Sequence, residues 1–193
     1  MKLDHPPLYL ASKSPRRREL LEAAGISYSL IDVDVEEIHP IEMDIEDVPE
    51  YLARIKAEAA IPKLSGEELV VAADSVVIMD GRIFGKPSTK EEAREMISLL
   101  AGRHHLVITG VFIGNHLRGE GFSDYTSVWL ESMSDAEIHY YVDACSPLDK
   151  AGSYGIQDWI GWVKVSRIEG SYANVMGLPV HKVYEVLAQW NTA

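Results

Sequence analysis

The sequence is poor in cysteine, in basic residues and in long apolar runs. Cys145 is the only cysteine among 193 residues, which excludes an intramolecular disulfide and a zinc site built from several thiolates. The 18 Lys and Arg residues against 30 Asp and Glu residues leave a net charge of −12, which argues against binding to duplex DNA. The longest apolar runs, such as residues 69–73, fall far short of the roughly 20 residues that span a bilayer. We therefore expect a cytoplasmic protein whose partners include neither duplex nucleic acid nor a membrane.

Alternating strand-like and helix-like segments predict a single α/β domain over residues 1–193, with a mixed sheet. Apolar residues make up 47% of the chain and charged residues 25%, as in ordinary soluble domains. We expect strands at residues 8–11, 27–33, 69–79, 106–113, 122–130 and 161–168. We expect helices at residues 15–24, 48–64, 89–101, 134–144 and 179–190.

Several local signals mark the ends of these elements. Ser14 is placed to cap the first helix, with Pro15 at its first position and Gly25 just beyond its end. Two pairs match the capping-box pattern at helix starts, Thr89 with Glu92 and Ser134 with Glu137. The dipeptide at residues 80–81, Asp-Gly, predicts a tight hairpin after the long apolar strand.

A basic cluster stands at the first predicted strand-to-helix junction. Lys13, Arg16, Arg17 and Arg18 lie within six residues of an otherwise acidic chain. Cations in the first turn of a helix face the positive end of its dipole, so a bound anion such as phosphate would offset them. The alternative is a solvated face whose bases pair with Glu19, Glu22 or the acidic segment 32–37; the pattern alone does not separate the two.

Asp74 is the second candidate, because it interrupts an apolar strand. A buried carboxylate is costly unless it is paired, bound to a metal or at a sheet edge. An Asp in this place suits a metal ligand or a base that activates water. The alternative is a structural Asp that accepts hydrogen bonds from a nearby turn.

Further charged and polar residues are weaker candidates. Lys56 and Lys86 could each reach a phosphate as a point charge, although isolated lysines are mostly solvated. The acidic run of Asp32, Asp34, Glu36 and Glu37 places alternate side chains on one face of a strand, which could hold a divalent cation or simply face solvent. In the glycine-bearing loop 149–157, Gln157 offers a donor and an acceptor that suit the edge of a pyrimidine.

The motifs at these positions resemble those of the Maf family of nucleoside triphosphate pyrophosphatases. The matches run almost from end to end: Leu10-Ala11-Ser12-Lys13-Ser14-Pro15-Arg16-Arg17, Val35-Glu36-Glu37, Ala53-Arg54-Ile55-Lys56-Ala57, Ala73-Asp74-Ser75, Gly85-Lys86-Pro87, Asp149-Lys150-Ala151-Gly152-Ser153-Tyr154-Gly155-Ile156-Gln157 and Gly177-Leu178-Pro179. Asp158 and Trp159 stand where a glycine normally follows Gln157 in the family, and Ser127 stands where an acid is common.

The resemblance implies a fold and an activity. The fold would be of the Maf and ITPase type: a strongly curved mixed sheet flanked by helices, with a cleft between two lobes. The protein would form a homodimer. The activity would be metal-dependent hydrolysis of a nucleoside triphosphate between the α and β phosphates. The form of the late loop, together with the hydroxyl residue Ser75 after Asp74, resembles the branch that acts on dTTP and UTP.

The resemblance also implies a role for each matching residue. Asp74 would be the proton acceptor, while Arg16, Ser75 and Gln157 would set substrate specificity. The residues expected to bind the phosphates are Ser12, Ser14, Arg16, Lys56 and Lys86. Glu37 and Asp74 would hold Mg²⁺ or Mn²⁺, and whether Asp74 is base, ligand or both stays open. Two alternative functions also stay open: a nucleotide-sensing regulator of septum formation without turnover, and a pyrophosphatase for another base such as 7-methyl-GTP.

Overall fold

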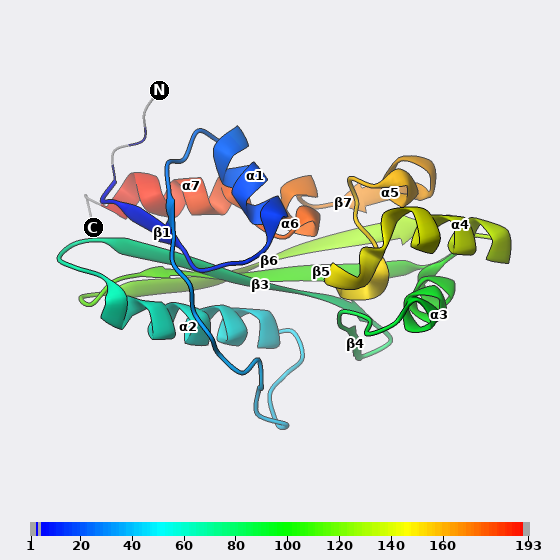
Figure 1. The fold of residues 1–193 in the computed structure, drawn as a ribbon, viewed down its shortest axis with the longest axis horizontal. Helices are drawn as coiled ribbons and strands as arrows, with labels where there is room; N and C mark the ends of the chain where they lie inside the picture. The colour runs from blue at the N-terminus through cyan, green and yellow to red at the C-terminus, as the bar shows by residue number, and fades with distance from the viewer. Residues whose placement is uncertain (1–2, 4, 191–193) are drawn as a thin grey trace. The chain divides into compact units, whose positions relative to one another are not determined.

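The computed structural model describes residue 3 and residues 5–190, which form a mixed α/β fold (Figure 1). The strands are β1 (Leu8–Leu10), β2 (Ser29–Leu30), β3 (Leu69–Met79), β4 (Arg82–Phe84), β5 (His104–Gly114), β6 (Gly119–Leu130) and β7 (Val165–Glu169). The α-helices are α1 (Pro15–Ala23), α2 (Val48–Ala60), α3 (Lys90–Leu100), α4 (Asp135–Cys145), α5 (Trp159–Val163), α6 (Tyr172–Met176) and α7 (Val180–Gln189). None of the helices in these residues is long and apolar enough to cross a membrane.

The strands form one mixed sheet, which confirms the predicted fold class. Across the described residues the order is β2-β1-β3-β5-β6-β7, with β4 pairing with β3 off this path. β1 is parallel to both β2 and β3, whereas β4 is antiparallel to β3 and β7 is antiparallel to β6. Asp80 and Gly81 both have positive φ in the β3–β4 turn, as a two-residue hairpin requires.

The chain divides into two compact units, and β3 passes from one to the other after Asp74. The first unit holds the described residues up to Asp74, residues 109–124 and those from Gly177 onward. The second unit holds residues 75–108 and 125–176. Each unit has its own apolar core, so each is described by itself.

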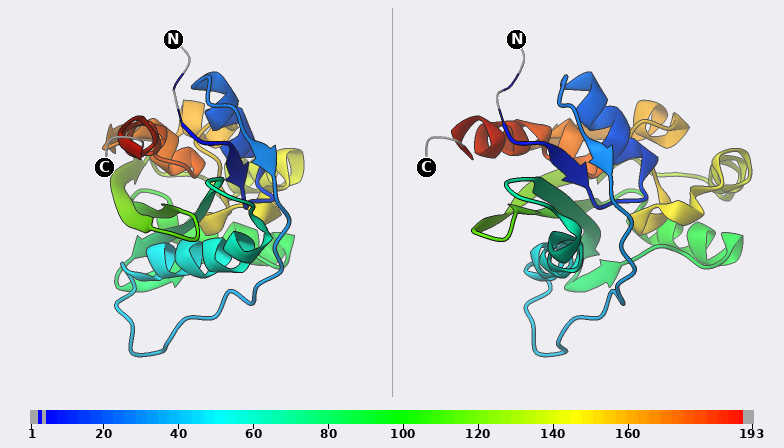
Figure 2. Two further views of the ribbon diagram at one scale, coloured as in Figure 1. Left: turned by 90° about the vertical axis from the view of Figure 1, so that its left-hand side faces the viewer. Right: turned by 60° about the vertical axis from the view of Figure 1, so that its left-hand side comes forward.

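In the first unit, helices cover both faces of the sheet. Helices α1 and α7 lie on one face and α2 on the other (Figures 1 and 2). Helix α2 approaches β5 so closely that a Cβ atom on Gly110 would lie 2.1 Å from the backbone nitrogen of Glu50. Only glycine fits at that crossing, and the close approach fixes the height of α2 above the sheet.

Two predicted strands differ from the structure. The segment 27–33 is a strand only at Ser29–Leu30, because its partner β1 ends at Leu10 and offers no further backbone groups. Residues 161–163 are helical rather than extended, because the backbone N–H groups of Gly161 and Trp162 donate to the carbonyl of Asp158. The strand begins only at Val165.

The helix starts follow the predicted caps in part. The capping box of Ser134 and Glu137 is complete. Thr89 accepts a hydrogen bond from the Glu92 backbone, but the Glu92 carboxylate accepts from Ser88 rather than from Thr89. Ser14 stands at the N-cap of α1 with Pro15 at the first helical position, as predicted, although its side chain forms no cap hydrogen bond.

His105 is a titratable group inside the core of the second unit. It is 1% exposed, and its Nε2 lies 2.6 Å from the hydroxyl oxygen of Tyr154. Burial, and to a smaller extent the charge of His104, lower the pKa of His105 from 6.5 to about 4.

We expect the free energy of unfolding to fall as the pH drops from about 6.5 to about 4, because the unfolded chain then binds a proton that the folded His105 refuses. The neutral, buried His105 contributes about 3 kcal/mol to the free energy of unfolding, and this contribution is lost progressively across that pH range. Urea denaturation at several pH values should show a clearly flatter profile for His105→Gln and only a small change for the exposed control His104→Gln, because the charge of His104 is the smaller of the two causes. Identical profiles for His105→Gln and the wild type would contradict the assignment.

Candidate functional site

The alternation of β3 decides what Asp74 faces. Leu69, Val71 and Ala73 belong to one apolar cluster of the first unit, whereas Val70 and Ala72 pack with the other. Successive side chains of a strand point to opposite faces, so Asp74 continues the second set. That set packs with Ala53 and Ala57 of α2, which places the Asp74 carboxylate beneath this helix.

Helix α2 supplies the partner of the buried carboxylate. Lys56 Nζ lies 2.6 Å from Asp74 Oδ1, and both residues are less than one-tenth exposed. Alanines at positions 53, 57 and 60 let the helix lie close to the strand, so the lysine stem is buried with them. The interpretation of Lys56 as an ordinary surface lysine is therefore wrong.

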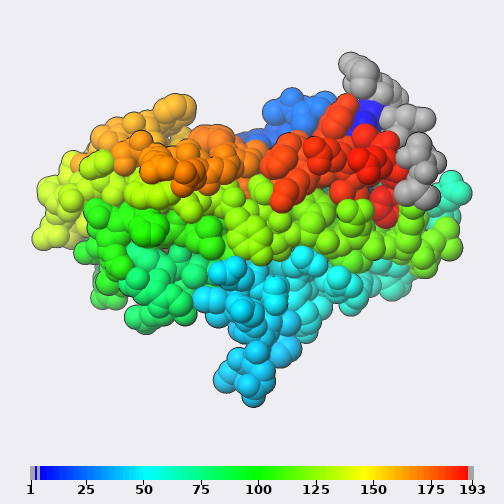
Figure 3. Space-filling view, turned by 180° about the vertical axis from the view of Figure 1, so that it is seen from behind, coloured from blue at the N-terminus to red at the C-terminus, as the bar shows by residue number. Residues whose placement is uncertain are grey.

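Glu37 reaches the same ammonium group from an irregular segment. Its Oε1 lies 2.7 Å from Lys56 Nζ, and its side chain is half exposed. No strand forms between Leu30 and α2, so the predicted strand face of Asp32, Asp34, Glu36 and Glu37 does not exist. From that run, it is Glu37 that forms the ion pair with Lys56. Figure 3 shows the end of this segment protruding from the surface of the first unit.

Arg17 joins this cluster from α1. Its Nη1 donates to Ser12 Oγ at 3.1 Å, and its Nε donates to the carbonyl of Gly177 at 2.8 Å. Burial lowers the pKa of the Arg17 guanidinium; the carboxylates of Asp74 and Glu37 oppose this shift, and the charge of Arg16 adds to it. The backbone N–H of Ser14 also donates to Ser12 Oγ, so Ser12 organises the turn before α1.

The basic cluster therefore splits into residues with different surroundings. Lys13 pairs with Asp32 at 3.7 Å, with both side chains about four-fifths exposed, as the solvated alternative expected. Arg16 is half-buried in the first turn of α1, where its charge acts on Arg17. The first unit thus brings together Ser12, Ser14, Arg16, Arg17, Glu37, Lys56 and Asp74.

Three predicted residues belong to the second unit. Ser75 follows Asp74 in β3, and Lys86 is exposed in the segment after β4. Gln157 lies in the late loop, which meets the Lys86 segment through a hydrogen bond of 3.0 Å from the Gly152 N–H to the Gly85 carbonyl. Within this unit, the structure therefore brings the Lys86 and Gln157 segments together.

Gln157 has an unusual side-chain environment. Its backbone carbonyl accepts a hydrogen bond from Trp162 Nε1 at 3.0 Å. Its side-chain Oε1 is buried but has no hydrogen-bond partner among the described residues. Because buried polar atoms are nearly always paired, this acceptor is suited to a ligand that brings its own donor.

The carboxylates of the first unit suit a hard divalent cation only in part. Within residue 3 and residues 5–190, no group of three or more His, Cys, Asp or Glu residues converges as a metal cage would. Asp74 and Glu37 nevertheless meet at one point, which the Lys56 ammonium holds. Mg²⁺ is usually bound by one or two carboxylates together with water and substrate phosphates, so this pair fits a metal that arrives with a phosphate ligand.

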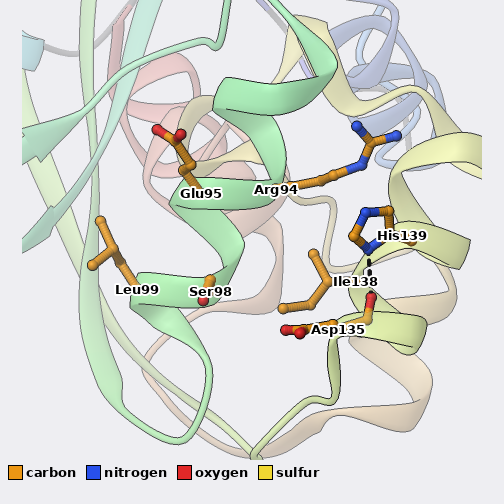
Figure 4. Close-up of a pocket in the computed structure, with 7 residues that line it drawn as sticks. All are labelled: Arg94, Glu95, Ser98, Leu99, Asp135, Ile138 and His139. Atoms are coloured by element: carbon orange, nitrogen blue, oxygen red, sulfur yellow. Dashed lines mark hydrogen bonds between the residues drawn. The ribbon is translucent and has the colours of Figure 1, made fainter.

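A pocket of about 450 Å³ lies elsewhere in the second unit, between α3 and α4 (Figure 4). It is lined by Arg94, Glu95, Ser98, Leu99, Asp135, Ile138 and His139. His139 Nδ1 is engaged with the Asp135 carbonyl at 2.7 Å, and Arg94 pairs with Glu91 and Asp143. None of the predicted site residues lines this pocket.

Sequence reasoning missed Arg17 as a distinct member of the site. It treated the four bases as one cluster, and only Arg16 was singled out. Helical spacing contains a usable signal, because Arg17 and the buried Leu21 are four residues apart and share one face of α1. The buried face of the helix therefore begins at Arg17.

Comparisons with known proteins identify relatives over nearly the whole chain. A family model described as Maf-like protein matches residues 7–190. A dTTP/UTP pyrophosphatase of Porphyromonas gingivalis is 48% identical over 183 residues, which cover 93% of this chain and 92% of the relative. One of Phocaeicola vulgatus is 44% identical over 186 residues, 96% of either chain. Among solved structures, the Ham1 protein of Staphylococcus aureus is 18% identical with a TM-score of 0.47, covering 64% of this chain and 71% of that one.

We expect Lys56→Met to lower the free energy of unfolding by about 3 kcal/mol, because it leaves the buried Asp74 carboxylate without its cation. The double variant Lys56→Met with Asp74→Asn should lose at least about 1 kcal/mol less free energy of unfolding than the sum of the losses in the two single variants. Urea denaturation of the four proteins measures this coupling. Lys13→Met removes an exposed pair and should change stability by less than about 0.5 kcal/mol. Strict additivity would show that the 56–74 pair does not stabilise the fold.

Proposed function

The chain belongs to the Maf family, and from that premise we propose that it is a nucleoside triphosphate pyrophosphatase that hydrolyses dTTP and UTP. The products would be the nucleoside monophosphate and pyrophosphate. The observation that carries the proposal is the buried ammonium of Lys56 between the carboxylates of Asp74 and Glu37, next to the arginines of α1. This pairing of a general base with an anion-binding group is the minimum that hydrolysis of a phosphoanhydride needs.

The first unit supplies the groups for the triphosphate. A triphosphate carries about four negative charges, so an acidic protein needs a local basic region to bind it. Arg16 and Lys56 provide positive charge, and the positive end of the α1 dipole lies at the turn that follows Ser12 and Ser14. Arg17, tied to Ser12 and Gly177, positions that turn. Lys86 of the second unit is assigned to the phosphates on the family motif.

Glu37 and Asp74 are the residues that would hold a divalent cation, Mg²⁺ or Mn²⁺. A bound cation would neutralise charge on the phosphate oxygens as pyrophosphate leaves. The Lys56 ammonium lies between these two carboxylates. Its flexible four-carbon stem would let Nζ reach a phosphate oxygen as well, while the backbone of α2 stays fixed.

Asp74 is assigned to the attacking water. The water oxygen forms a bond to the α phosphorus while the bond from that phosphorus to the α–β bridging oxygen breaks. The electron pair of the broken bond leaves with pyrophosphate, and one proton of the water passes to the Asp74 carboxylate. The position of Asp74 in the rigid middle of β3 holds this base in a fixed orientation.

The second unit supplies the group for the base. Gln157 carries a buried acceptor that no other described residue pairs with, and a uracil or thymine ring offers an N–H donor beside a carbonyl acceptor. A residue with both a donor and an acceptor can therefore pair with that edge. Arg16 and Ser75 are assigned to specificity on the same family motifs.

Because the family match spans both units, we propose that the two units work as one functional domain over residues 1–193. The homodimer that the resemblance implies and the cytoplasmic location that the composition predicts belong to the same proposal.

A panel of triphosphates tests the proposal directly. We expect pyrophosphate release from dTTP and UTP with Mg²⁺ or Mn²⁺ and none after chelation, with kcat/KM for these two exceeding that for CTP, GTP and 7-methyl-GTP. Chromatography distinguishes monophosphate and pyrophosphate from diphosphate and phosphate. Unchanged nucleotides would indicate a sensor without turnover, and preference for 7-methyl-GTP would place the chain in another branch.

Asp74→Asn should lower kcat at least about a hundredfold, because the amide cannot take a proton from water. The matched control is Asp124→Asn, which alters another buried carboxylate of the first unit that is paired with a lysine, Lys182, at 2.7 Å. The control should keep kcat within about twofold of the wild type, even if its stability falls. Near-normal turnover by Asp74→Asn would exclude Asp74 as the base.

A further inference from the structure

The hydroxyl group of Tyr141 is buried in the second unit and has two partners. Tyr141 is fully buried in α4, and its hydroxyl donates to Asp158 Oδ2 at 2.8 Å. The same oxygen accepts a hydrogen bond from the backbone N–H of Gly155 at 3.0 Å. Burial raises the pKa of Tyr141 well above its usual range, so the group stays a neutral donor.

These two partners are the ends of the turn that carries Gln157. The backbone N–H of Asp158 donates to the Gly155 carbonyl at 3.0 Å, which closes a four-residue turn around Ile156 and Gln157. The Gln157 carbonyl is held in turn by the indole N–H of Trp162. The main chain on both sides of Gln157 is therefore tied to α4 and α5.

The turn is closely packed against its own carboxylate. A Cβ atom on Gly155 would lie 2.6 Å from Asp158 Oδ2 and 3.0 Å from Lys150 Cε. Lys150 Nζ lies 3.8 Å from the same Asp158 oxygen and 2.8 Å from Asp149, which offsets the charge of the two carboxylates. Asp158 thus has a defined structural use at a position where the family normally has glycine.

We propose that Tyr141 and Asp158 are positioning residues that hold the turn carrying Gln157 in the place from which its amide distinguishes uracil and thymine from cytosine. The inference rests on the proposed function. The ring nitrogen N3 of uracil and thymine carries a hydrogen, whereas N3 of cytosine is an acceptor. An amide oxygen held at this place accepts a hydrogen bond from N3 of uracil or thymine, whereas it faces the lone pair on N3 of cytosine and is repelled. Because the Gln157 side chain extends from this turn, a shift of the turn would move the amide oxygen away from N3 of the base, and the discrimination would be lost.

The decisive measurement is the ratio of kcat/KM for UTP to that for CTP. In Tyr141→Phe, which keeps the ring but removes the hydroxyl, we expect this ratio to fall at least about fivefold. The loss should come mainly from a higher KM for UTP, with kcat for UTP within about threefold of the wild type, because the phosphate groups are untouched. The matched control is Tyr140→Phe, a more exposed tyrosine of the same helix, which should keep the wild-type ratio.

Asp158 provides a second, independent pair of variants. Asp158→Asn keeps an oxygen that can accept a hydrogen bond from the Tyr141 hydroxyl. Its ratio of kcat/KM for UTP to that for CTP should therefore stay close to the wild-type ratio. Asp158→Ala removes the acceptor and should reproduce the fall seen in Tyr141→Phe. These two decide the question if Tyr141→Phe fails to fold, because the Asp158 side chain is partly exposed and its loss leaves a smaller cavity.

The outcomes separate the inference from the function on which it rests. If the wild type hydrolyses UTP but folded Tyr141→Phe and Asp158→Ala keep the wild-type ratio, the positioning role is wrong and the proposed function stands. The positioning role is equally wrong if Asp158→Asn loses as much of the ratio as Asp158→Ala does. If the wild type hydrolyses neither UTP nor dTTP, the proposed function fails and the inference falls with it.

Discussion

The ion pair between Lys56 and Asp74 is the constraint on which the first unit depends. A carboxylate in the middle of an apolar strand can stay ionised only if a cation reaches it inside the protein. The cation comes from α2, and it can come only because Ala53 and Ala57 let the helix lie close to the strand. Gly110 makes the same close approach possible on β5. Small residues on two elements, α2 and β5, therefore make one charged contact possible.

That constraint explains why the sequence predicts some site residues well and others poorly. Asp74 could be predicted because a lone acid among apolar strand residues has few explanations. Lys56 could not be distinguished from a surface lysine, because a helical pattern of alanines says where the helix packs but not which neighbouring charge it covers. The contacts of each arginine in α1 were harder to predict. Adjacent residues on a helix point about 100° apart, and although Arg17 shares a face with the buried Leu21, only the packed structure shows that its guanidinium reaches Ser12 and Gly177.

Where the predicted fold was wrong, tertiary contacts had overridden a local pattern. The alternating residues 27–33 would suit a longer strand, but β1 provides only Tyr9 and Leu10 as parallel partners. Residues 161–163 suit a strand by composition, yet the Asp158 carbonyl captures the backbone N–H groups of Gly161 and Trp162 and begins a helical turn there. Strand prediction needs the length of the neighbouring strand, which no local window contains. The long elements β3, α3 and α4 were predicted within a few residues, because the signals that define them lie within or next to each segment: a long apolar run for β3, and capping residues with helical periodicity for α3 and α4.

In the proposed function, the two units would divide the recognition of a nucleotide in a way that follows from the range of the forces involved. Charge attraction falls off slowly and has little direction, so lysines and arginines suit the triphosphate that every such substrate carries. A neutral hydrogen bond fails when its partner is rotated or reversed, so it can report which base is attached. The first unit accordingly concentrates Arg16, Arg17 and Lys56. The second unit leaves the uncharged oxygen of Gln157 as an acceptor and surrounds its main chain with hydrogen bonds. Charged groups tolerate small movements, whereas the Gln157 amide can distinguish bases only if its position is fixed. This difference agrees with the larger number of main-chain hydrogen bonds around Gln157.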